Sequence, residues 1–133
     1  MNFRNYQNRT TVLIPMRALD EGKSRLSNIL SRSSRARLVE LLFSQLLKKL
    51  NTLRCQFPKI FSDVVVITPC KKVKELSEEF NAIVLEEPMP NNLNSALTLG
   101  LTWSFENGYN SSLIIPGDII DPLTKDIKKI ITL

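Results

Sequence analysis

The first apolar run of the chain is Thr11-Val12-Leu13-Ile14, and it leads directly into Pro15-Met16-Arg17. The run does not alternate apolar with polar residues, which is typical of a strand covered on both faces of its sheet. Three later runs share this continuous pattern: residues 64–67, 83–85 and 113–115. The sequence therefore predicts four buried strands of a mostly parallel sheet.

A long amphipathic segment separates the first two of these runs. Over residues 35–53, leucines recur at three- and four-residue spacing while the charged residues fall at other positions. This spacing predicts a helix with one apolar face. Either Ser33 or Ser34 is expected to be its N-cap, because a serine oxygen can accept a hydrogen bond from a free N–H group of the first turn.

Three more helices are predicted, over residues 72–80, over residues 92–106 and after Asp121. Asn107-Gly108 is expected to end the second of them in a left-handed conformation, and Asp121 before Pro122 to cap the last. Strands and helices thus alternate along the chain. Because crossovers between parallel strands are right-handed, this order predicts an α/β, three-layer Rossmann-like fold with a mostly parallel sheet.

The size and composition of the chain suit one domain, residues 1–133, with 43% hydrophobic and 23% charged residues. Four strands make a thin sheet for this architecture, so we expect a C-terminally truncated or split protein, or one that needs a partner such as a second copy in a homodimer. No apolar stretch reaches the length of a membrane span, and residues 1–10 do not resemble a signal peptide. The expected location is the cytoplasm.

The chemistry-bearing residues exclude several classes of site. The chain has no histidine and only two cysteines, Cys55 and Cys70, so a zinc cluster and histidine acid–base catalysis are excluded. Its net charge of +5 suits small polyanions or nucleic acid. Because no aromatic residues are interleaved with the basic ones as stacking platforms, nucleic acid is the less favoured ligand.

The loop after the first strand carries three cations, Arg17, Lys23 and Arg25. Arginine and lysine are the usual side chains that hold phosphate oxygens, so this loop predicts a phosphate site. Gly22-Lys23-Ser24 resembles the end of a P-loop, but the first glycine of that motif would fall at position 17, which is arginine. A solvated basic loop is the alternative reading of this segment alone.

Two further loops follow predicted strands. Asn94 lies at the entrance of the predicted third helix, where an amide could read a base edge or simply cap the helix. Asp118 follows a buried strand in Pro116-Gly117-Asp118, where a carboxylate could hold Mg²⁺ on nucleotide phosphates or bond its own backbone in a turn. Asp121 is better explained as a helix cap than as a second metal ligand.

Together these segments resemble the CofC family, itself similar to MobA-like nucleotidyltransferases. The resemblance implies the nucleotide-diphospho-sugar transferase form of the Rossmann-like fold, C-terminally truncated. The resemblance runs from Thr11 to about Ile130 and is carried by Ile14-Pro15-Met16-Arg17 with Gly22-Lys23-Ser24-Arg25-Leu26, by residues 93–97, and by the Pro-Gly-Asp turn. It implies transfer of GMP from GTP to a phosphorylated three-carbon acid with release of pyrophosphate, in the biosynthesis of coenzyme F-420. Implied acceptors are 2-phospho-L-lactate, phosphoenolpyruvate and 3-phospho-D-glycerate.

The resemblance also implies roles for individual residues. The triphosphate would be held by the three cations of the first loop, and Mg²⁺ by Asp118. The nucleoside would be contacted by Pro15, Leu93, Asn94 and Ser95. Two other readings remain at this level: a sugar-nucleotide glycosyltransferase, whose usual Asp-x-Asp motif is missing here, and a non-catalytic basic module that binds nucleic acid or a partner.

Overall fold

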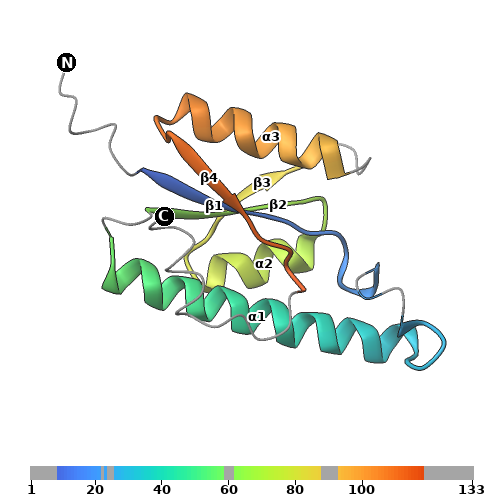
Figure 1. Ribbon diagram of the computed structural model, residues 1–133. Coiled ribbons are helices and arrows are strands. Elements are labelled where there is room, and N and C mark those ends of the chain that lie inside the picture. Colours follow the sequence, from blue (N-terminus) through green and yellow to red (C-terminus); the bar gives the residue numbers. More distant parts are fainter. Residues whose placement is uncertain (1–8, 22, 24–25, 59–61, 88–92, 119–133) are drawn as a thin grey trace, which may run out of the picture.

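The computed structural model describes residues 9–21, 23, 26–58, 62–87 and 93–118, and it confirms the four predicted strands. They are β1 (Thr10–Pro15), β2 (Asp63–Thr68), β3 (Ile83–Glu86) and β4 (Ser111–Ile114). They form one sheet in the order β3-β2-β1-β4, in which every neighbouring pair is parallel. The chain therefore moves outward from β1 to β3 and then crosses back to place β4 on the other side of β1 (Figure 1).

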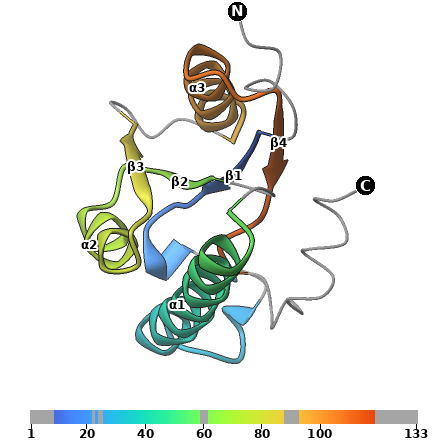
Figure 2. The same cartoon turned by 90° about the vertical axis from the view of Figure 1, so that its left-hand side faces the viewer.

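Helices cover both faces of this sheet, as the three-layer prediction requires. The helices α1 (Arg32–Gln56) and α2 (Lys71–Glu79) lie on one face, and α3 (Leu93–Glu106) lies on the other (Figure 2). The change of face follows from right-handed crossovers, because the connection through α3 runs across the sheet in the opposite direction to the first two. The helix predicted after Asp121 lies outside the described residues.

The apolar runs of the central strands are continuous because each face has its own core. Val12 and Ile14 pack with α1 and α2, whereas Leu13 packs with Ala96 of α3 on the opposite side. The strands β1 and β2 are buried almost throughout. Burial is less complete in β3 and β4, which lie at the two edges of the described sheet. The apolar residues of β3 are half-buried, and burial on both faces was wrong for Ile114 of β4, which is 43% exposed.

The first helix begins earlier than its leucine spacing predicted. It starts at Arg32, and its N-cap is Ser31, whose Oγ accepts a hydrogen bond of 3.1 Å from the backbone N–H of Ser34. The prediction of Ser33 or Ser34 as the cap was therefore wrong: Ser34 supplies the N–H that is capped. Among the described helices, α1 included, none is both long and apolar enough to span a membrane.

The third helix ends as predicted and packs very closely on the sheet. Gly108 follows it with φ of +84°, the left-handed conformation expected of Asn107-Gly108. Gly100, in the middle of the helix, would bring a Cβ atom to 2.9 Å from Ile67 Cδ1. The absence of a side chain at this position therefore lets α3 approach the sheet closely.

Candidate functional site

A cavity of about 720 Å³ opens at the carboxyl edge of the sheet, where ligands of parallel α/β folds bind. Its walls come from the segments that follow β1, β2 and β3 and from the first turn of α3. They include Pro15, Arg17, Cys70, Glu87 and Leu93. Four separate stretches of sequence thus meet around one hollow of the size that small-molecule sites have.

The strand register brings these segments to one level. Pro15 pairs with Ile67, and Thr68 pairs with Glu86, so three strands end side by side. Backbone hydrogen bonds extend this pairing by one residue: Met16 N–H donates to the Ile67 carbonyl at 2.9 Å, and Glu87 N–H donates to the Thr68 carbonyl at 3.2 Å. The residues just beyond the strands are therefore held by the ladder of the sheet.

Three of the predicted site residues are on the cavity wall. Pro15 ends β1, Arg17 follows it with an exposed side chain, and Leu93 begins α3 with 55% of its surface exposed. The cavity therefore joins a cation that can hold phosphate to an apolar surface at a helix N-terminus. The roles of these residues toward phosphate and nucleoside stay predictions.

The other predicted nucleoside contacts, Asn94 and Ser95, lie in the first turn of α3 but are not among the residues that line the cavity. Both are exposed. The carbonyl of Asn94 accepts a hydrogen bond of 2.8 Å from the Thr98 hydroxyl. Their roles toward a nucleoside stay predictions.

Lys23 continues the cationic loop, whereas Arg25 lies outside the described residues. Lys23 is half-buried, and its φ of +53° is in the left-handed region that residues other than glycine rarely adopt. Its carbonyl accepts a hydrogen bond of 2.9 Å from the N–H of Leu26, which closes a turn. The loop thus holds Lys23 in a specific backbone conformation before the chain enters α1.

An ion pair connects an earlier part of this loop to the start of α1. Asp20, in the short 3-10 helix Leu19–Glu21, bonds the Nε atom of Arg32 at the start of α1 with a distance of 2.6 Å. Leu19 beside it is buried in the core. The loop that carries Arg17 is therefore tied to the sheet by Met16 and to α1 by Asp20.

The predicted metal ligand, Asp118, is brought next to this loop by its neighbour. A Cβ atom at Gly117 would overlap Met16 Sδ and lie 3.2 Å from Ile14 Cγ2. The Pro116-Gly117-Asp118 turn therefore packs directly on the residue that precedes Arg17. Within the described residues no group of three acidic or thiol side chains that could hold a metal is formed.

This close packing predicts a measurable cost of adding one methyl group. Gly117→Ala should lower the free energy of unfolding by about 1–3 kcal/mol, because the new Cβ atom overpacks the site against Met16 and Phe43. Urea unfolding would measure the loss. The double variant with Met16→Ala should lose less stability than the sum of the losses in the two single variants, because the smaller side chain removes the overlap. Additive losses would contradict this account.

Glu87 is a site residue that the sequence analysis did not identify. It is half-buried on the cavity wall. Burial raises the pKa of its carboxyl group above the ordinary value, and the charge of Arg17 offsets only part of that rise. The two groups therefore attract each other through the cavity. The sequence pattern could not single out Glu87, because Glu86 and Glu87 are consecutive glutamates at the end of a strand and nothing in the pattern distinguishes them.

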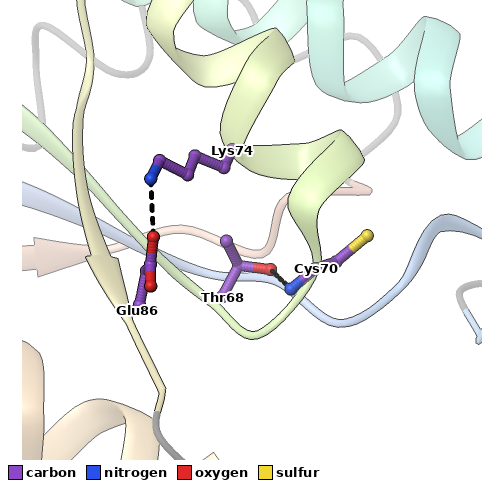
Figure 3. Close-up of polar contacts among 4 residues, drawn as sticks. All are labelled: Thr68, Cys70, Lys74 and Glu86. Carbon is purple, nitrogen blue, oxygen red and sulfur yellow. Dashed lines mark hydrogen bonds and ion pairs between the residues drawn. The ribbon is translucent and has the colours of Figure 1, made fainter.

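The neighbouring Glu86 is engaged elsewhere, on the side of α2. Its Oε1 atom bonds Lys74 Nζ at 2.6 Å, and Cys70 N–H donates to Thr68 Oγ1 at 3.1 Å where α2 begins (Figure 3). The bond raises the pKa of Lys74 and lowers that of Glu86. These residues border a second hollow of about 470 Å³. Of the two glutamates, Glu87 alone lines the cavity that contains Arg17.

The chain is similar to known guanylyltransferases. The family described as guanylyl transferase CofC like matches residues 10–133. A 3-phospho-D-glycerate guanylyltransferase of Phenylobacterium zucineum is 33% identical over 106 residues, which are 79% of this chain and 47% of that protein. One of Colwellia psychrerythraea is 30% identical over 113 residues, 85% of this chain and 51% of that protein.

The chain spans about half the length of these curated relatives. The residues of this chain that match the family, 10–133, include the parallel sheet, the cationic loop and the cavity at the strand ends. Since the family match covers the whole described fold, the chain belongs to the CofC-like guanylyl transferase family.

Proposed function

We propose that this chain binds GTP in the cavity at the strand ends and takes part in the transfer of its GMP group to a phosphorylated three-carbon acid. The observation that carries the proposal is the meeting of Arg17, the N-terminus of α3 and Glu87 around one hollow at the carboxyl edge of the sheet. Membership of the CofC-like family supports the same reaction class.

The favoured acceptor is 3-phospho-D-glycerate, because two relatives carry that substrate in their names. The related acids 2-phospho-L-lactate and phosphoenolpyruvate are the other acceptors to compare. All three carry a phosphate and a carboxylate, so a cationic loop suits each of them. The product would be an activated, diphosphate-linked acid that serves the biosynthesis of coenzyme F-420.

The chemistry requires alignment and charge neutralisation. A phosphate oxygen of the acceptor attacks the α-phosphorus of GTP and forms the new P–O bond, while the bond to the β-phosphate oxygen breaks and pyrophosphate leaves. No protein nucleophile is needed. Arg17 and Lys23 would neutralise charge on the departing pyrophosphate, because guanidinium and ammonium groups hold phosphate oxygens by charge-assisted hydrogen bonds.

The residues present also suit Mg²⁺. A Mg²⁺ ion bound to nucleotide phosphates usually takes one or two protein carboxylates and keeps several waters, so a single aspartate beside the cationic loop suffices. Asp118 is half-buried in the turn that packs on Met16. We propose that its carboxylate holds the ion, which when bound would offset phosphate charge.

The proposal predicts Mg²⁺-dependent GTP binding by the chain, measured by calorimetry. Lys23→Ala and Asp118→Asn should each weaken binding on the order of tenfold, because each removes one charged contact. Lys48→Ala, on the exposed side of α1, is the control and should bind GTP like the unchanged chain. Incubation with GTP and each acid, followed by detection of pyrophosphate, identifies the acceptor.

Two outcomes would contradict the proposal. The first is a folded chain that does not bind GTP at all. The second is binding to nucleic acid that falls steeply with salt while free GTP is ignored, which would make the chain a basic binding module instead.

A further inference from the structure

The cavity carries opposite charges on its two sides. Arg17 follows β1 and Glu87 follows β3, with β2 between them, so the strands from which they extend are about 10 Å apart. No ion pair joins the two side chains within the described chain, although the charge of Arg17 acts on Glu87. A ligand that bridges them would therefore need an anionic end and, some distance away, hydrogen-bond donors.

A guanine nucleotide has this polarity. Its phosphates are repelled by the carboxylate of Glu87 and attracted by Arg17, which leaves one orientation in the cavity. An ionised carboxylate is an acceptor only, with two oxygens. The Watson–Crick edge of guanine presents two adjacent donors, N1–H and the 2-amino group, whereas adenine presents an acceptor at N1 beside its 6-amino group.

The apolar part of the cavity wall suits a base better than a sugar. Leu93 and Ala96 of α3 lie on the cavity wall, and Leu93 leaves more than half of its surface exposed. An aromatic base would cover such an apolar surface, whereas ribose hydroxyls would gain nothing from it. The segment after β2, with Pro69 and Cys70, lies between the two charges and is where the ribose would pass.

We propose that Glu87 selects guanine by accepting hydrogen bonds from N1–H and from the 2-amino group of the base. This inference rests on the proposed nucleotide site and adds a residue that determines its specificity. The carboxylate must be ionised to accept both bonds. Burial raises the pKa of Glu87, and the charge of Arg17 on the other side of the cavity offsets part of that rise.

The test measures the affinity of the chain for GTP, ITP and ATP by calorimetry. The hypoxanthine base of ITP lacks the 2-amino group, so ITP should bind roughly tenfold more weakly than GTP. Glu87→Gln should weaken GTP binding by about the same factor and bring GTP and ITP close together. A carboxamide has both a donor and an acceptor, which matches adenine, so the affinity of Glu87→Gln for ATP should rise relative to its affinity for GTP.

Glu86→Gln is the matched control, because it makes the same change one residue away, at a side chain that bonds Lys74 outside this cavity. It should leave the order of the three nucleotides unchanged. Equal affinity of the unchanged chain for GTP and ITP would overturn the inference without any variant. The inference would also be overturned if Glu87→Gln bound GTP, ITP and ATP in the same order of affinity as the unchanged chain. A chain that binds no nucleotide would instead overturn the proposed function itself.

Discussion

Replacing Arg17 by alanine should weaken GTP binding on the order of 100-fold, because a guanidinium that holds phosphate oxygens in two parallel hydrogen bonds makes one of the strongest polar contacts available. The position of Arg17 supports a loss of affinity of this size. Arg17 is exposed on the cavity wall, and the backbone before it is fixed to β2 by the Met16 hydrogen bond. Calorimetry with the Mg²⁺ complex of GTP measures the change.

Two further variants show whether the contact is specific. Arg37 lies exposed on α1, so Arg37→Ala lowers the net charge equally without touching the cavity, and it should bind GTP like the unchanged chain. Arg17→Lys keeps the charge but loses the paired geometry, so its loss should be intermediate. If Arg37→Ala weakened binding as much as Arg17→Ala, the attraction would come from the overall positive charge and the assignment of Arg17 would be wrong.

The sequence predicted the fold well where burial decides it. The continuous runs of β1 and β2 and the leucine spacing of α1 are direct consequences of cores on both sides of the sheet. It predicted poorly at the edges. The fourth strand was expected over residues 113–115, but β4 begins at Ser111, whose hydroxyl bonds that of Thr10 at 2.8 Å. A hydrogen-bonded polar pair has no apolar signal, so the pattern missed it.

The site was predictable in outline because strand ends and cations are visible in a sequence. The loop with Arg17 and the helix entrance at Leu93 were both identified, and they meet around one cavity. Glu87 was missed for a physical reason: its importance depends on which way it faces. Glu86 and Glu87 are adjacent and chemically identical, and only the packing of α2 shows that the first is paired with Lys74.

The other large effect expected is on stability, from Phe43. This side chain is fully buried in α1, and it lies 3.3 Å from the place where a Gly117 Cβ would be. It therefore supports both the core beneath the sheet and the turn that carries Asp118. Phe43→Ala should lower the free energy of unfolding by about 3–5 kcal/mol, because the transfer energy of the ring is lost and a cavity remains.

Urea unfolding followed by circular dichroism measures this loss, and the control is on the same helix. Leu41 is 55% exposed, so Leu41→Ala should change the free energy of unfolding by about 0.5 kcal/mol or less. Phe43→Leu, which fills much of the cavity, should fall between the two and stays informative if the alanine variant does not fold. A loss in Phe43→Ala no larger than in Leu41→Ala would mean that α1 does not pack on the sheet as described. If Phe43→Leu lost much stability and also bound GTP more weakly, this core would be linked to the position of Asp118, because the Phe43 ring packs both in the core and against the turn that carries Asp118.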